Sequence, residues 1–197
     1  GLKCIYHICK FLLLKVMANK LFVAGTEPRS GKSAVILGLM ELLTRDIKKV
    51  AFFRPIIDAD HRRGERDNTI ELVKSQYNLC YDYEEMYAYT TTELSLLTSM
   101  GKQAELHGGI LAKFDALAAK SDFVLCEGIE LEGAAASFEF DLNADISNNL
   151  GCPVMLVAGA RRHTVEELVQ SIKLYHDSLV EKSCDIVATI INRVDSH

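Results

Sequence analysis

The 197-residue sequence has little proline, little glycine and no excess of positive charge. Its 3 prolines and 12 glycines are too few for a long disordered linker. The formal net charge of −5 argues against a nucleic-acid partner, which would need a surface stripe of lysine and arginine. The length, with 49% hydrophobic and 25% charged residues, fits one globular domain with a full core.

The six cysteines lack the spacing of a metal site or of a redox pair. None stands in a Cys-x-x-Cys pair, and no group of cysteine and histidine has the spacing of zinc ligands. Cys126 and Cys152 lie within or beside apolar runs that predict buried strands. We therefore expect reduced thiols in a cytoplasmic protein rather than disulfides.

The first nineteen residues are apolar, but the apolar stretches are short. Lys3, Lys10 and Lys15 divide the segment, and its longest apolar run is four residues. A membrane helix needs about 20 apolar residues, and a signal peptide needs an unbroken apolar core of about 7–15 residues. We expect no membrane partner. We interpret residues 1–18 as a leader or start-site extension and residues 19–197 as the domain. Met17 looks like a natural start that leads into the first strand, and residues 1–16 before it are expected to be helical if ordered.

Residues 20–45 predict a strand, a loop and a helix in succession. An apolar strand stops at Gly25, a polar loop ends in Gly31-Lys32-Ser33, and apolar residues then return at helical spacing. Helix-start N–H groups carry partial positive charge and suit a phosphate, while Lys32 adds a full charge. We predict that this loop binds Mg-ATP or another nucleotide through Gly25, Thr26, Glu27, Arg29, Ser30, Gly31, Lys32 and Ser33, with the Ser33 hydroxyl on magnesium.

The loop departs from the usual phosphate-loop pattern. Five residues rather than four separate Gly25 from Gly31, and Thr26 stands where the pattern has glycine. Pro28 also removes one N–H group from the loop. An ordinary strand–helix turn with a chance Gly-Lys-Ser is the alternative interpretation. The order of strand, loop and helix favours the nucleotide loop.

Strands and helices alternate along the rest of the chain. Apolar runs predict strands at 20–25, 49–56, 122–127, 153–158 and 185–192, with a short extended piece at 86–89. Helices are expected at 32–45, 69–77, 93–120, 141–150 and 164–182, with a break at Gly108-Gly109 and a loop at 127–140. The pattern predicts a doubly wound α/β fold, with a mainly parallel sheet of at least five strands and helices on both faces.

Several of these strands are followed by charged or amide side chains. Ligands of open α/β sheets bind at the carboxyl ends of the strands. There Arg54 is a candidate phosphate or substrate contact, and Glu127 is a candidate magnesium ligand. Asp67 is a further candidate magnesium ligand, and Asn192 a candidate contact for an adenine edge. Each has the structural alternative of a surface charge or a strand end, and no residue stands out as catalytic.

Several motifs match a known family. The phosphate loop resembles that of dethiobiotin synthetase, which also has five residues between its glycines, and Arg54-Pro55 and Glu127-Gly128 fit the same plan. Residues 19–194 resemble more closely the N-terminal domain of long-form bacterial phosphate acetyltransferases. The most specific stretches are FEFDLNAD at 138–145 and NLGCPV at 149–154.

The resemblance implies a P-loop, dethiobiotin-synthetase-like domain with a regulatory and assembly role. Acetyl transfer between coenzyme A and phosphate would belong to a C-terminal domain of the same chain, within a cytoplasmic homo-oligomer. We expect this sequence to be a fragment of that longer chain. The alternatives are a free-standing ATP-dependent dethiobiotin-synthetase-type ligase and a structural module with a degenerate nucleotide site. Arg54 in place of lysine, and Glu130 and Glu132 in place of small residues, argue against the ligase.

Overall fold

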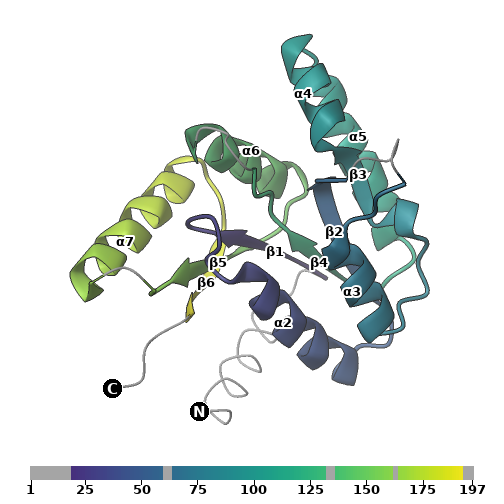
Figure 1. Ribbon diagram of the computed structural model, residues 1–197, viewed down its shortest axis with the longest axis horizontal. Coiled ribbons are helices and arrows are strands. Elements are labelled where there is room, and N and C mark those ends of the chain that lie inside the picture. The colour runs from purple at the N-terminus through teal and green to yellow at the C-terminus, as the bar shows by residue number, and fades with distance from the viewer. Residues whose placement is uncertain (1–18, 60–63, 132–135, 162–163, 193–197) are drawn as a thin grey trace.

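A six-stranded parallel sheet forms the centre of the molecule (Figure 1). The computed structural model describes residues 19–59, 64–131, 136–161 and 164–192. The sheet has the order β3-β2-β4-β1-β5-β6, and every pairing in it is parallel. Its strands are β1 (Lys20–Gly25), β2 (Val50–Ile57), β3 (Tyr87–Thr90), β4 (Phe123–Glu127), β5 (Val154–Gly159) and β6 (Ile186–Asn192). The predicted fold class is confirmed, and the extended piece expected at 86–89 is strand β3.

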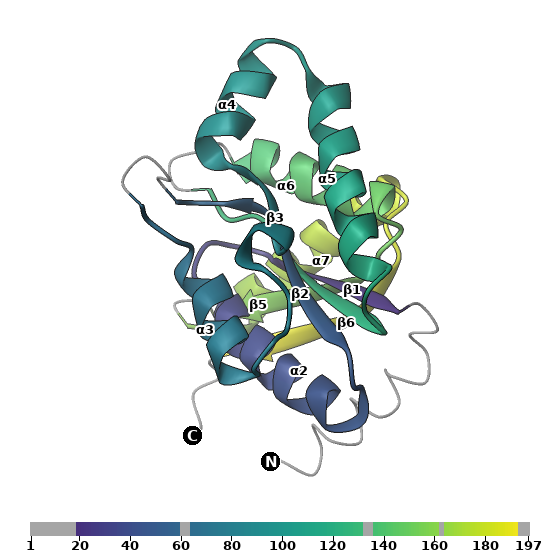
Figure 2. The same cartoon turned by 90° about the vertical axis from the view of Figure 1, so that its right-hand side faces the viewer.

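Helices cover both faces of the sheet (Figures 1 and 2). One face carries α2 (Lys32–Asp46) and α3 (Asn68–Gln76), and the other carries α5 (Gln103–Ala118), α6 (Ala136–Asn149) and α7 (Val165–Glu181). Helix α4 (Thr91–Ser99) packs against α5, and both project beyond the sheet. A short 3-10 helix, η2 (Tyr83–Glu85), precedes β3. This is the doubly wound arrangement that alternating strands and helices predict.

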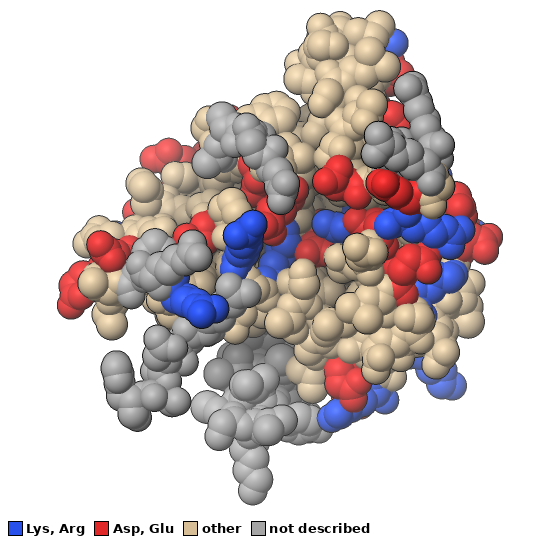
Figure 3. Space-filling model, viewed as in Figure 1, with Lys and Arg blue, Asp and Glu red and all other residues tan. Residues whose placement is uncertain are grey.

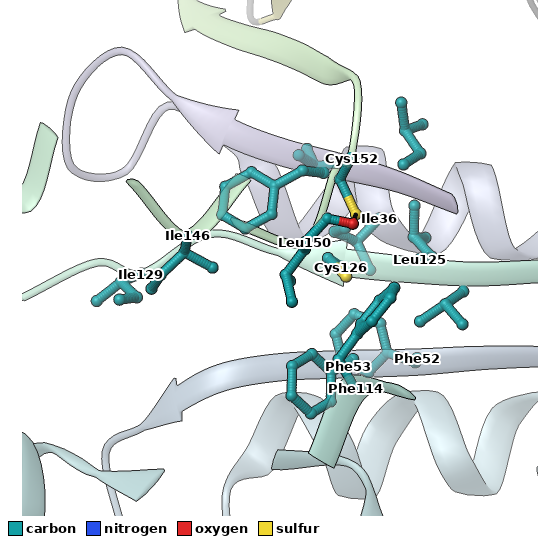
Figure 4. Close-up of a cluster of buried hydrophobic side chains, with 14 of the residues drawn as sticks. Ile36, Phe52, Phe53, Phe114, Leu125, Cys126, Ile129, Ile146, Leu150 and Cys152 are labelled. Carbon is teal, nitrogen blue, oxygen red and sulfur yellow. Dashed lines mark hydrogen bonds between the residues drawn. The ribbon is translucent and has the colours of Figure 1, made fainter. Parts of the chain in front are cut away.

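The covered sheet explains the continuous apolar runs in the sequence. Successive strand residues point to opposite faces, so helices on both faces bury neighbours such as Phe52 and Phe53 together. Phe53 packs edge-on against Phe114 of α5, with ring centroids 5.8 Å apart. Figure 4 shows these rings beside the buried Cys126, with Cys152 farther from them, and both thiols are free. Burial raises the pKa of the Cys126 thiol and keeps it protonated.

The predicted break in the long helix is in the wrong place. The helix divides at Gly101, whose φ of 67° ends α4, while Gly108 and Gly109 lie inside α5. The N–H of Lys102 donates to Leu97 O (2.8 Å), which closes the end of α4. Gly109 has a packing role instead, because a Cβ there would lie 2.7 Å from Tyr89 Cζ. Glycine lets strand β3 approach α5.

Helix α6 begins at Ala136, within the segment 127–140 that the sequence predicts to be a loop. Two of its polar side chains, Glu139 and Asn143, lie one turn apart and accept N–H groups of the loop after β4. These contacts join the first turns of α6 to the loop that precedes it, over 8 and 14 positions of sequence, and hydrophobic periodicity does not reveal them.

The leader predicted at residues 1–18 lies outside the described residues. Among the residues that the structure does describe, no helix has both the length and the apolar composition to cross a membrane.

Candidate functional site

The loop between β1 and α2 folds back on the end of the sheet. The Thr26 N–H donates to Val157 O of β5 (3.0 Å), so the start of the loop continues the pairing of β1 with β5. A Cβ at Gly25 would lie 2.7 Å from Ser30 Oγ, so glycine is needed for this close approach. Ser30 is buried, and its hydroxyl has no hydrogen-bond partner among the described residues. The loop therefore has a tight, fixed path with an unused polar atom inside it.

Gly31 turns the loop into helix α2. Its φ of 88° is left-handed, a conformation that favours glycine, and Arg29 is also left-handed with φ 62°. Ala34 N donates back to Gly31 O (3.1 Å), which begins the helix. The first N–H groups of a helix lack intrahelical partners, so this turn suits an anion.

Lys32 is a buried cation that reaches from α2 to the end of β4. Only 4% of its surface is exposed. Its Nζ donates to Gly128 O (2.6 Å) and lies 3.9 Å from Glu127 Oε1 and 3.9 Å from Glu130 Oε2. Burial lowers the pKa of Lys32, and the two carboxylates oppose that shift. The Lys32 side chain thus links the phosphate loop to the carboxylates of Glu127 and Glu130.

Glu127, Arg54 and Asp67 form a line of paired charges beside Lys32. Arg54 Nε lies 3.2 Å from Glu127 Oε2, and Arg54 Nη1 pairs with Asp67 Oδ2. The other Asp67 oxygen accepts the Ile70 N–H (2.9 Å) and caps α3. Burial disfavours the charged form of Arg54, but the adjacent carboxylates outweigh it and raise its pKa. Figure 3 shows basic and acidic side chains interleaved across the middle of one face of the molecule.

Arg54 lies within β2 rather than at its end. Strand β2 pairs with β4 only as far as Phe53, opposite Cys126, and then continues beside β3 to Ile57. The two strands part just before Arg54 and Glu127, so these side chains meet where the sheet opens.

The loop after β4, residues 128–131, is fastened to α6 from one side. Asn143 Oδ1 accepts the Ile129 N–H (2.7 Å), and its amide donates to Ile129 O (3.1 Å). Glu139 Oε2 accepts the Leu131 N–H (2.9 Å). A Cβ at Gly128 would lie 2.9 Å from Asn143 Oδ1, so glycine permits this packing. Asn143 and Glu139 are not among the site residues predicted from the sequence, although both stand in the FEFDLNAD stretch.

Glu130 extends from this fastened loop onto the phosphate loop. Its Oε1 accepts the Arg29 N–H (2.9 Å), while Oε2 lies near the Lys32 ammonium. The loop N–H and the loop cation therefore converge on one carboxylate. A nucleotide phosphate is an anion with the same kind of oxygen acceptor, so the residues present fit such a group.

The structure brings the predicted site residues together at one edge of the sheet. The phosphate loop and first turn of α2 hold Gly25, Thr26, Glu27, Arg29, Ser30, Gly31, Lys32 and Ser33, and the charge line holds Arg54, Asp67 and Glu127. Ser33 is exposed at the start of α2. The Asn192 amide donates to Ser30 O and Gly31 O, each at 3.4 Å, so it braces the loop from β6.

The acids of the site are engaged with cations. Within the described residues, no group of three or more histidine, cysteine, aspartate or glutamate side chains has the arrangement of a metal site. Both oxygens of Asp67 have protein partners, and Glu127 faces Arg54 and Lys32. A magnesium ion there would need water and phosphate oxygens for most of its ligands.

The parallel sheet, the strand–loop–helix and the buried lysine define a P-loop, NTPase-like α/β domain. The chain belongs to the AAA domain family, whose sequence pattern matches residues 19–197.

The relatives include two kinds of named enzyme. The chain is 48% identical to a phosphate acetyltransferase of Nitratidesulfovibrio vulgaris and 39% identical to one of Synechocystis, over 90% of its own length in each case. It spans only 25% of the length of each of these relatives. It is 25% identical to an ATP-dependent dethiobiotin synthetase of Aromatoleum aromaticum, with 88% of this chain and 77% of the relative covered. The similarity that the sequence motifs indicate, to both families, is confirmed.

Solved structures share the fold. The BceF tyrosine kinase domain superposes with a TM-score of 0.54 at 21% identity, covering 94% of this chain and 73% of that one. The kinase domain of the Escherichia coli tyrosine kinase ETK gives a TM-score of 0.52 at 15% identity, covering 95% and 74%.

Proposed function

We propose that this chain is a nucleotide-binding regulatory and assembly domain of a phosphate acetyltransferase. The observation that carries nucleotide binding is the convergence of the Arg29 N–H and the Lys32 ammonium on one anionic group. Such a pair of donors at a helix start is the arrangement that holds phosphates.

In this proposal the loop and its neighbours divide the work of holding the nucleotide. Lys32 and backbone N–H groups of the phosphate loop, such as that of Arg29, contact the phosphates, and Arg54 adds a second cation behind them. Asn192 keeps the loop in place and contacts the base. When bound, magnesium offsets the phosphate charge, with the Ser33 hydroxyl and Glu127 as protein ligands. Asp67 becomes a ligand only if it releases Arg54 or the start of α3.

The names and lengths of the relatives support the proposal that the parent enzyme is a phosphate acetyltransferase. These relatives are named phosphate acetyltransferase and are about four times as long as the matching region, which leaves room for a separate acetyltransferase part of the same polypeptide. We propose that this part carries the acetyl transfer, that the present domain regulates and assembles it, and that the assembly is a cytoplasmic homo-oligomer.

Calorimetric titration with MgATP tests nucleotide binding. We expect the chain to bind MgATP and the Lys32→Ala variant to lose at least about tenfold in affinity, because a buried charge-assisted contact is removed. Lys48→Ala, at an exposed lysine, is the matched control and should bind like the unchanged chain. Circular dichroism verifies that both variants are folded. Equal binding by all three proteins would contradict the proposal, and so would a lack of binding that persists when the Glu130 carboxylate is removed.

An assay of acetyl phosphate formation from acetyl-CoA and phosphate tests the division of labour. The chain by itself is expected to be inactive, since none of the residues assigned here acts on a thioester. Activity of the isolated chain would overturn the assignment of acetyl transfer to another part.

A dethiobiotin-synthetase-type ligase is the second candidate. The 77% coverage of the named synthetase favours it, because this chain matches a far larger share of that relative than of the phosphate acetyltransferases. An assay with diaminopelargonate, bicarbonate and MgATP decides between the two. We expect no product, because Glu130 occupies the region beside Lys32 with a negative charge.

A further inference from the structure

Glu130 places a carboxylate of this chain on its own phosphate loop. We propose that this carboxylate is an internal anion that competes with nucleotide phosphates for the Arg29 N–H and the Lys32 ammonium, and must leave them when a nucleotide binds. The inference rests on the proposed nucleotide site and adds a built-in control of its affinity.

Both oxygens of the Glu130 carboxylate take part. Oε1 accepts the Arg29 N–H at 2.9 Å, and Oε2 lies 3.9 Å from Lys32 Nζ. The Arg29 residue is held in a left-handed conformation with φ 62°, which fixes the direction of its N–H. A charged acceptor makes a stronger hydrogen bond with an N–H than a neutral one does. The carboxylate therefore uses the two donors that a phosphate needs.

The fold holds the backbone at Glu130 in place. Its neighbours on both sides are hydrogen-bonded to α6, Ile129 through Asn143 and Leu131 through Glu139. Lys32 itself holds Gly128 O at 2.6 Å. Residues 128–131 thus form a short bridge between α6 and the phosphate loop, with Glu130 at its centre.

The exposure and charge of Glu130 explain why a nucleotide can displace its contact with Lys32. Glu130 is 35% exposed, so water weakens its attraction to Lys32, while Glu127 is buried and stays with the lysine and Arg54. A polyphosphate carries several negative charges and cannot share these donors with Glu130 without repulsion. When the nucleotide arrives, the Glu130 side chain moves into solvent and the loop 128–131 loses its link to Arg29.

Titrations of the Glu130→Gln and Glu130→Ala variants test this inference. Calorimetry with MgATP, and separately with inorganic tripolyphosphate, measures the affinity of each variant and of the unchanged chain. We expect both variants to bind both probes about tenfold more tightly, since a competing charge-assisted contact is gone. Glu181→Gln makes the same change of charge as Glu130→Gln at an exposed residue of α7, and we expect no effect.

The outcomes separate this inference from the proposed function. Binding by the variants alone supports the inference, because the unchanged chain is then closed by its own carboxylate. Equal affinities, or equal gains in Glu181→Gln, overturn it while leaving the nucleotide site intact. Weaker binding of MgATP by both variants also overturns it and makes Glu130 a ligand of the nucleotide or its metal. No binding by any protein overturns the inference and the proposed function together.

Discussion

Arg54 Nε lies 3.2 Å from Glu127 Oε2, directly beyond the residues at which strands β2 and β4 end their pairing. The other oxygen of Glu127 lies 3.9 Å from Lys32 Nζ. One buried carboxylate therefore compensates two cations, the partly buried Arg54 of β2 and the buried Lys32 of the phosphate loop. The pair also links β2 to β4 beyond the point where the two strands stop sharing backbone hydrogen bonds.

Removing the Glu127 carboxylate should destabilise the fold. Glu127→Ala leaves the buried Lys32 and the partly buried Arg54 without this counter-charge, and breaking a buried pair in this way costs about 3–5 kcal/mol. Urea denaturation of the variant measures the loss in the free energy of unfolding. Glu181→Gln, at the exposed end of α7, should change this free energy by less than about 0.5 kcal/mol. Equal free energies of unfolding for the two variants would show that the ion pairs of Glu127 do not stabilise the fold.

Asn143 should control the order of the loop after β4. Asn143→Ala removes both hydrogen bonds to Ile129 and leaves the buried N–H and carbonyl of Ile129 unsatisfied. We expect the free energy of unfolding to fall by about 2–3 kcal/mol. Hydrogen exchange of residues 128–131 should then become faster. Asn149→Ala, on the exposed side of the same helix, is the control. Unchanged exchange in Asn143→Ala would mean that α6 does not hold this loop.

The two adjacent glycines of α5 should respond in opposite directions to alanine. A Cβ at Gly108 meets nothing within 4 Å, so Gly108→Ala should stabilise the helix by about 0.5–1 kcal/mol. A Cβ at Gly109 would overlap the Tyr89 ring, so Gly109→Ala should destabilise by about 1–3 kcal/mol. Thermal melts of both variants make the comparison. Shifts of the same sign would show that Tyr89 does not pack on α5 as described.

Tyr175 of α7 should make the protein less stable in alkali. Burial raises the pKa of its hydroxyl above the ordinary value of 10.0, with a further contribution from the Glu139 charge. The unfolded chain therefore loses this proton at lower pH than the folded chain does. The stabilising effect is complete below pH 10 and is lost as the pH rises from there towards the folded pKa. Urea denaturation at pH 8 and pH 11 should show a smaller drop for Tyr175→Phe than for the unchanged chain. An identical drop in the free energy of unfolding for the two proteins would mean that the Tyr175 hydroxyl is exposed to water in the folded chain.

Strands, the phosphate loop and most helices could be predicted because their signals are local. Runs such as residues 21–24 and 154–158 are buried on both faces of the sheet, so each is apolar without interruption. The loop from Gly25 to Ser33 needs glycine for its path and charge for its ligand, and both stand in the sequence. The helix break predicted near Gly109 was wrong, because glycine at that position makes room for the Tyr89 ring. The turn between α4 and α5 is at Gly101 instead.

By itself, the sequence determined the alternation of strand and helix, the position of the phosphate loop and the family resemblance, because each depends on neighbouring residues. Only the tertiary structure decided the partners of the charges. Arg29 and Glu130 are 101 positions apart in the chain, and Lys32 and Gly128 are 96 apart. Parallel strands bring such residues to one edge of the sheet through long crossovers. Whether a charge there meets a ligand, a counter-ion or the chain's own carboxylate is set by that geometry.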